Sequence, residues 1–195
     1  MKNILVVGLM LALFGCEKIT PVDKNITYYY NLDSLITQQQ SLLTKAKATV
    51  DKKARISGDS SETSFEPDSL EWADELNVFR EATINMPVLK GLYKTETKED
   101  DKSNLKIKEF SPIDNQELEV SYLRIYYLDN IENIRKLEAE YIEDNPIYHS
   151  ERTFIMMFDD INNQPVLSGY YIKGDQKMIL QDTMSFEIQG VVSHD

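Results

Sequence analysis

The stretch LEVSYLRIYYL, residues 118–128, decides how this chain folds. Two sets of side chains alternate along it, and alternation with a period of two is typical of a β-strand. One set comprises Leu118, Val120, Tyr122, Arg124, Tyr126 and Leu128. The other set begins with Glu119 and Ser121 and continues with Leu123 and Ile125, so we expect the second half of the strand to be covered on both sides.

The period of two extends over most of residues 88–192. Short alternating or apolar segments are separated there by turn-forming residues such as Asp144-Asn145-Pro146 and Gly174-Asp175. This is the pattern of strands joined by short loops. Besides the stretch already quoted, we expect strands at residues 91–97, 105–110, 152–158, 166–173, 176–181 and 186–192.

Residues 131–143 fit two structures. Ile134 and Tyr141 agree with a weak helical spacing, whereas Leu137 and Ala139 alternate with glutamates as in a strand. We favour the strand, because turn signals and other strands lie on both sides of the segment. The expected sheet then has seven or eight strands.

The N-terminal part has a helical period instead. From residue 31 to residue 56, apolar side chains recur three and four positions apart, and basic residues gather near the end. A second helix is expected over residues 67–86, because Pro67 favours a first turn and Pro87 prevents continuation. The sequence therefore predicts an α+β fold: an N-terminal helix pair packed on one face of an antiparallel meander sheet.

Composition limits the class of protein. The chain has 195 residues, 42% of them apolar, which suffices for one domain with a substantial core. Its formal net charge of −12 argues against nucleic acid as a partner, because phosphates require a basic surface. The single cysteine excludes a disulfide scaffold and a multi-cysteine metal site.

The N-terminus has the features of a secretion signal. Lys2 supplies a basic start, and Ile4 to Phe14 form an apolar run of eleven residues. As a helix this run rises about 16 Å, about half the thickness of a membrane core, so it is too short to span. We therefore expect residues 1–15 to be a signal peptide that is removed.

The only cysteine follows this run directly. Leu13-Phe14-Gly15-Cys16 resembles the lipobox of bacterial lipoproteins, in which leucine and a small residue precede the acylated cysteine. The alternative is an ordinary signal peptide in which a cysteine falls here by chance. The resemblance implies that Cys16 becomes the lipidated N-terminus of the mature protein, and burial of two or three acyl chains holds a protein firmly on a membrane.

The resemblance also implies a place in the cell and a domain plan. The chain is similar to the small envelope lipoproteins of unknown function in Gram-negative bacteria, so we expect it in the cell envelope, at the outer membrane, on its periplasmic face or at the cell surface. Residues 16–30 would form the lipidated tether, and residues 31–193 a single folded domain. No further protein family is suggested by the residues.

Few residues point to catalysis. The two histidines are His149, in a turn region, and His194, the penultimate residue, so neither a two-histidine metal site nor a Ser–His–Asp arrangement is indicated. Glycines are too few and too scattered for a phosphate-binding loop. We expect no enzyme activity, no metal and no cofactor.

Aromatic residues are the best candidates for binding. Eleven tyrosines are present, many of them in expected strands, where tyrosine also packs well for purely structural reasons. The candidate surface for a ligand or partner comprises Tyr122, Tyr126, Tyr170 and Trp72. A protein partner is one reading; the alternatives are an apolar ligand carried between sheet and helices, or a glycan stacked on tyrosines.

Overall fold

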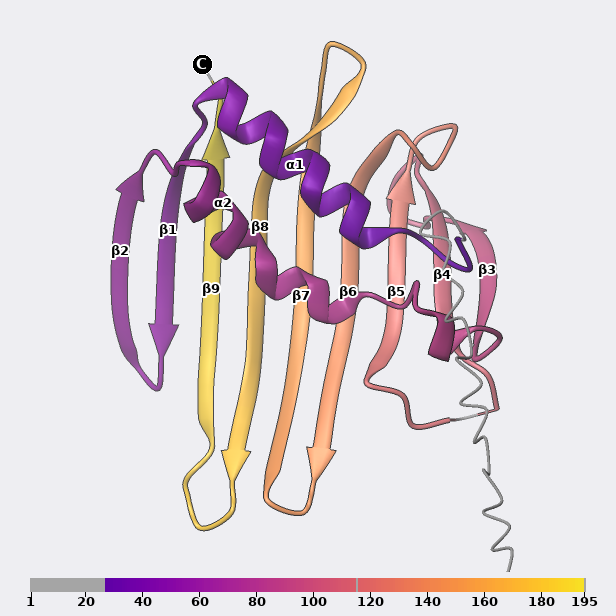
Figure 1. The fold of residues 1–195 in the computed structure, drawn as a ribbon, viewed down its shortest axis with the longest axis vertical. Coiled ribbons are helices and arrows are strands. Elements are labelled where there is room, and N and C mark those ends of the chain that lie inside the picture. Colours follow the sequence, from indigo (N-terminus) through magenta and orange to yellow (C-terminus); the bar gives the residue numbers. More distant parts are fainter. Residues whose placement is uncertain (1–26, 115, 195) are drawn as a thin grey trace, which may run out of the picture.

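The computed structural model describes residues 27–114 and 116–194. It has two layers, an open antiparallel sheet and a helix pair that crosses one of its faces (Figure 1). The predicted α+β class is confirmed. The expected signal peptide, Cys16 and most of the expected tether lie outside the described residues.

The sheet has nine strands in the described part of the chain, in the order β2-β1-β9-β8-β7-β6-β5-β4-β3. From β3 to β9 each strand pairs with the next, which is the predicted meander, and the β1–β2 hairpin is added beside β9. The expected turn at Gly174-Asp175, between strands over residues 166–173 and 176–181, was wrong, because a single strand runs from Gln164 to Met178 and both residues pair with β9. The strands are β1 Thr49–Ile56, β2 Asp59–Phe65, β3 Tyr93–Glu99, β4 Lys106–Pro112, β5 Val120–Tyr127, β6 Ile134–Asn145, β7 Tyr148–Ile161, β8 Gln164–Met178 and β9 Met184–Ser193.

Two α-helices and two 3₁₀ turns form the second layer. They are α1 Leu32–Ala46, α2 Ser69–Asn77, η1 Val78–Ala82 and η2 Pro87–Leu89. The side chain of Asn31 accepts a hydrogen bond from the Ser34 N–H at the start of α1. Asp68 and Glu71 form a capping box at the start of α2, so both helices begin where a capping side chain satisfies free backbone N–H groups.

The first helix ends at Ala46, so the prediction of a helix over residues 31–56 was wrong for its last part. Lys47 has a φ of 50°, a left-handed conformation that ends a helix, and residues 49–56 form β1. Ser57 and Gly58 also have positive φ angles, 48° and 99°. Two such residues make the tight turn of a β-hairpin, a signal that sequence analysis took for the end of a helix.

The second helix is also shorter than the expected residues 67–86. It begins at Ser69, because Asp68 is the capping residue, and it tightens to a 3₁₀ turn at Val78. Thr83 is already extended, with φ −72° and ψ 117°. Burial of Thr83 and Ile84 explains this early end, since an extended segment brings both of these neighbouring residues into the interior.

The ambiguous segment 131–143 is confirmed as a strand. β6 begins at Ile134, after a turn in which Asn130 accepts hydrogen bonds from the N–H groups of Glu132 and Asn133. Its buried positions Leu137 and Ala139 alternate with half-buried glutamates, as the sequence indicated.

The stretch that decides the fold, β5, pairs with β6 through two register shifts that the alternation did not reveal, one between Val120 and Tyr122 and one between Tyr126 and Tyr127. An irregularity between Val120 and Tyr122 places Val120 on the same face as Leu123 and Ile125, and all three belong to the core. Tyr122 and Tyr126 therefore lie on the opposite, open face. The 3₁₀ turn η1 packs on one side of β5, and the side chains on the other side are only half-buried, so the expectation of cover on both sides was wrong.

The expected tether is too long at its C-terminal end. The N–H groups of Tyr28 and Tyr29 donate to Oδ1 of Asn85 at 2.8 and 3.0 Å. The Tyr29 hydroxyl also donates to the Leu89 carbonyl and accepts from the Tyr93 N–H, each at 3.1 Å. Tyr28 and Tyr29 are thus held by the domain and are not part of a free linker.

The core between the layers is filled by large side chains. The ring of Phe79 packs edge-on against Phe154 and Tyr170, with centroids 5.8 and 5.7 Å apart. Tyr170 lies over its cross-strand partner Gly190, where an added Cβ atom would fall within 3.0 Å of the tyrosine ring. Gly190 is therefore the position that lets this ring lie flat against β9 and reach α2.

We expect Gly190→Ala to lower the free energy of unfolding by about 1–3 kcal/mol, because the new methyl group displaces the Tyr170 ring. Urea denaturation followed by the fluorescence of Trp72, the only tryptophan, measures the change. Gln189→Ala, at an exposed position of the same strand, is the matched control and is expected to change stability by less than about 0.5 kcal/mol. Equal stability of Gly190→Ala and wild type would contradict this packing.

Candidate functional site

The structure separates the four aromatic residues that sequence analysis grouped as a surface. Trp72 and Tyr170 are 0% exposed and belong to the core, so their assignment to a binding surface was wrong. Their burial follows from Trp72 lying on the sheet-facing side of α2 and Tyr170 on the helix-facing side of β8. Tyr122 and Tyr126 are half-buried on the open face of the sheet, where they lie together.

A polar cluster surrounds Tyr122 and Tyr126. Both hydroxyl groups lie 3.3 Å from the Glu138 carboxylate. The Arg124 guanidinium lies 4.2 Å from the centre of the Tyr122 ring, and the Lys136 ammonium lies 3.9 Å from that of Tyr126. A cation thus already covers one face of each ring, and each charge in the cluster has a partner.

The electrostatics of this cluster indicate a structural role. Burial raises the pKa of Tyr122 to about 12, and the charges of Glu138 and Glu140 contribute to this rise. Burial on its own raises the pKa of Glu138, but the Lys136 hydrogen bond and the charges of Lys136 and Arg124 outweigh it and lower the pKa. The cluster is therefore a satisfied ion network across β5 and β6.

A different feature, which we name the α2 groove, lies between α2 and the parts of the sheet that α2 leaves uncovered. Its volume is about 420 Å³. Apolar side chains of the sheet form its floor, namely Ile56, Ile172, Met184, Phe186 and Ile188, and Val78 of η1 forms part of its wall. Its lining residues come from α2, η1 and the strands β1, β7, β8 and β9, whose arrangement Figure 1 shows. A groove of this size with an apolar floor is typical of a site for a small or extended apolar group.

Strand register builds the floor of the α2 groove. Ile56 pairs with Phe186, and Phe186 pairs with Gly174, so these three positions form one row across β1, β9 and β8. Ile172 and Ile188 form the next row. A Cβ atom at Gly174 would lie within 3.0 Å of the Glu151 carbonyl oxygen and 2.9 Å from the Phe186 ring, so glycine lets both the β7 backbone and this ring approach β8 closely.

Charged residues at the rim of the α2 groove are fixed by contacts with the protein. Glu75 on α2 accepts hydrogen bonds from the Tyr170 hydroxyl and from the Lys52 ammonium, the latter at 2.9 Å. At the other side, Arg152 forms an ion pair with Glu81, and donates to the Tyr148 hydroxyl at 3.1 Å. These contacts hold α2 and η1 at a set distance above the strands, so the groove is part of the folded structure.

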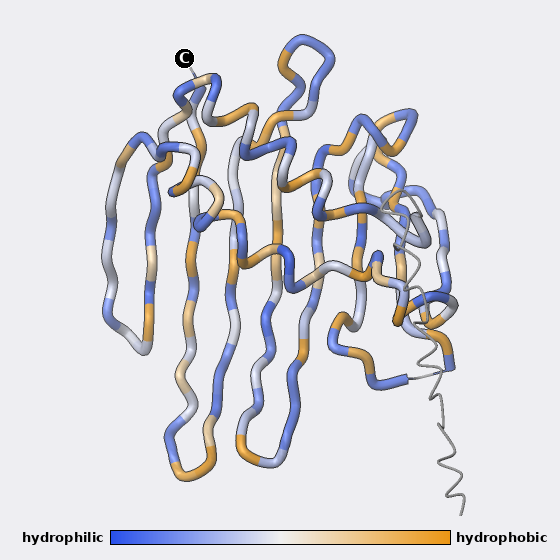
Figure 2. Tube along the Cα trace, in the orientation of Figure 1, coloured by the Kyte–Doolittle hydropathy of each residue, from blue (hydrophilic) through white to orange (hydrophobic). Residues whose placement is uncertain are grey.

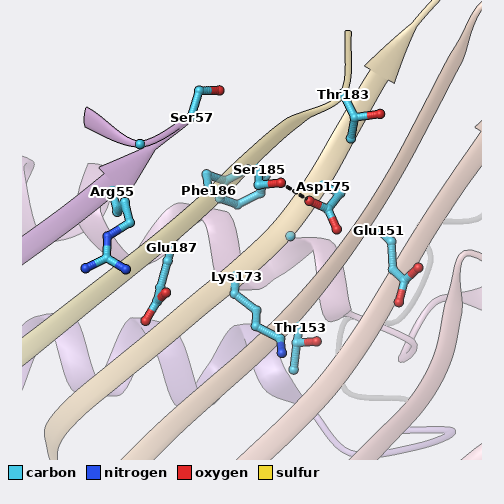
Figure 3. A pocket seen from close by; sticks show the side chains of 12 residues that line it. Arg55, Ser57, Glu151, Thr153, Lys173, Asp175, Thr183, Ser185, Phe186 and Glu187 are labelled. Carbon is cyan, nitrogen blue, oxygen red and sulfur yellow. Dashed lines mark hydrogen bonds between the residues drawn. The ribbon is translucent and has the colours of Figure 1, made fainter. Parts of the chain in front are cut away.

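The open face of the sheet has a hollow of another kind, drawn in Figure 3. It measures about 600 Å³, and charged side chains of both signs line it, including Arg55, Glu151, Lys173, Asp175 and Glu187. The Ser185 hydroxyl donates to Asp175 across it. Because cations and carboxylates alternate along neighbouring strands, this hollow resembles an ordinary solvated sheet surface more than a selective site.

The candidate residues for chemistry do not converge. Nδ1 of His149 lies 3.5 Å from Asp144, and both side chains are largely exposed. In the part of the chain that the structure describes, no group of three or more histidine, cysteine or acidic residues is placed to hold a metal ion. Nor does any described helix have the length and apolar character needed to cross a membrane.

Comparison with known proteins adds no relative. No protein-family model, no curated protein and no solved structure matches the chain.

Sequence analysis missed the residues of the α2 groove. The alternation of Phe186 and Ile188 with polar neighbours was visible and predicted a strand with one apolar face. Which part of that face stays uncovered depends on where α2 ends and on how the helices cross the sheet. Neither property is encoded in a local pattern.

Several buried tyrosines make stability depend on alkaline pH. Burial raises the pKa of Tyr30 to about 12 and raises that of Tyr170, to which the Glu75 hydrogen bond also contributes. An unfolded tyrosine ionises near pH 10, so above that pH the unfolded state holds fewer protons than the folded state. The contribution of these hydroxyl groups to the free energy of unfolding is therefore fully present below about pH 10 and is lost as the pH rises further.

We expect the free energy of unfolding to decline above about pH 10, by up to about 1.4 kcal/mol per pH unit for each such tyrosine. Urea denaturation across this range measures the slope. Tyr170→Phe should reduce the slope, because it removes one of the buried hydroxyl groups whose pKa is raised in the folded state. A stability that stays constant to about pH 12 would contradict the assignment of these buried hydroxyl groups.

Proposed function

We propose that this chain is a lipid-anchored, non-enzymatic binding module of the bacterial cell envelope that holds an apolar ligand, or an apolar segment of a partner, in the α2 groove. The observation that carries the binding part is the groove itself, about 420 Å³ with an apolar floor and a fixed charged rim. The anchor part rests on the lipobox resemblance of Leu13-Phe14-Gly15-Cys16.

Charge supports an anchored domain over one that adheres flat to lipid. The net charge is −12 and Lys2 is the only charged residue before Cys16, so a chain beginning at Cys16 has a net charge of −13. Anionic lipid head groups repel such a body. Acyl chains on Cys16 would then supply the attachment, with the outer membrane as the proposed location.

Burial of apolar surface supplies the energy for the proposed binding. Ile56 is 46% exposed and Met184 is 39% exposed, so both side chains offer surface that a ligand can cover. Covering apolar surface contributes about 25 cal/mol per Å². The core beneath the helices is filled, so a ligand would lie beside α2 and not beneath the helix pair.

The glycan alternative has less support. Stacking of a sugar needs an open aromatic face, and the Tyr122 and Tyr126 rings are half-buried with a cation over each. Their hydroxyl groups are also engaged by Glu138. An apolar occupant of the α2 groove is the function that the geometry favours.

The test is binding of a fluorescent long-chain fatty acid to the purified chain. We expect Ile56→Asp and Met184→Asp each to raise the Kd by about tenfold or more, because each places a charge in the apolar floor. Val191→Asp is the matched control: Val191 is 48% exposed, close to the 46% of Ile56, but lies on the open face of the sheet. The same affinity in all variants, or a loss caused by Val191→Asp alone, would contradict the proposal.

A further inference from the structure

Two neighbouring turns at one end of the sheet present apolar side chains to solvent. Ile147, in the β6–β7 turn, is 63% exposed; Met178, the last residue of β8, is 48% exposed, and Ile179 and Leu180, in the β8–β9 turn, are 60% and 99% exposed. The Ile179 N–H donates to the Ile147 carbonyl at 2.9 Å, so the two turns form one unit. We name these four residues the apolar tip; it lies at the lower end of the molecule in Figure 1, where Figure 2 shows hydrophobic colour in both turns.

Leu180 is not explained by the needs of its turn. Its φ angle is 63°, a left-handed conformation that costs a residue with a Cβ atom about 1 kcal/mol and that asparagine or glycine adopts more readily. The β7–β8 turn, at the opposite end of the sheet, has asparagine at its two left-handed positions, Asn162 and Asn163. A fully exposed leucine in the same conformation indicates that the side chain has a use outside the fold.

The chemistry of the apolar tip favours lipid over protein. Its side chains are aliphatic and protrude from turns, whereas protein interfaces typically depend on tyrosine, tryptophan and arginine seated in pockets. The charged residues within three positions of it are Asp144, Asp175, Lys177 and Asp182, so it lacks the excess of basic residues that binding to anionic lipid requires. Aliphatic side chains without basic companions match a lipid surface of low charge.

We propose that the apolar tip inserts into the lipid surface to which Cys16 attaches the chain, and so sets the orientation of the domain. This inference rests on the proposed anchor. Cys16 and Thr27 are eleven residue steps apart, so the chain between them reaches at most about 40 Å. Strand β8, at 15 residues, is about 50 Å long, so the anchor keeps Thr27, where the described domain begins, less than one strand length from the membrane.

The experiment uses the acylated full chain in phosphatidylcholine vesicles. Once Cys16 is acylated, an introduced cysteine is the only thiol, so Gln181→Cys places an environment-sensitive fluorophore beside Leu180. Asn163→Cys, in the turn at the opposite end of the sheet, is the matched control. We expect a blue shift and quenching by nitroxide-labelled lipid at position 181, and neither effect at position 163.

A second pair of substitutions checks that the effect belongs to the apolar tip. With the label at position 181, Ile179→Asp together with Leu180→Asp should abolish the blue shift while the protein still floats with the vesicles. Equal exposure to water at positions 181 and 163 in floating protein overturns the tip proposal and leaves the anchor intact. A chain that does not float with the vesicles at all contradicts both proposals.

Discussion

The structure depends on a mismatch between the length of the strands and the width of the helix layer. Strands β7 and β8 have 14 and 15 residues and are about 50 Å long, whereas two helices packed side by side cover only about 20 Å. Because α1 and α2 cross the strands and do not follow them, they cover one band of the sheet (Figure 1). The rest of that face is not covered by either helix, so its apolar side chains are exposed or are available for binding.

On the helix-facing side of the sheet, the band that the helices cover is packed, and the part that they leave uncovered has exposed apolar side chains. Under the helices, rings fill the space, and Tyr170 crosses Gly190 to reach Glu75, so α2 is joined to the sheet by packing and by a hydrogen bond. Beyond α2, the apolar row continues through Phe186 and Ile56 into the α2 groove, where the described residues leave Ile56 46% exposed. The covered band supplies stability, and the uncovered part supplies exposed apolar surface, which in our proposal is used for binding.

Local patterns predicted the class, the meander and most strands, because alternation along the chain is itself the cause of a strand with one buried face. They failed where long-range packing decides. Residues 49–56 have helical spacing in part, yet Ser57-Gly58 turns them into a hairpin that gains pairing with β9. Sequence analysis assigned Trp72 and Tyr170 to a binding surface, but α2 lies over the sheet in a position that buries both side chains in the core. The α2 groove was missed because it exists only where a helix ends above distant strands.

The most direct test of the account is native mass spectrometry of the protein isolated from the membranes of its own host. The account predicts a chain that begins at Cys16 and has covalent acyl groups, together with a small apolar molecule that dissociates on activation in the gas phase. If the Ile56→Asp variant, isolated in the same way, keeps the acyl groups but lacks the small molecule, the binding site of that molecule is the α2 groove. An unmodified chain of 195 residues with no bound molecule would contradict both the anchor and the binding function.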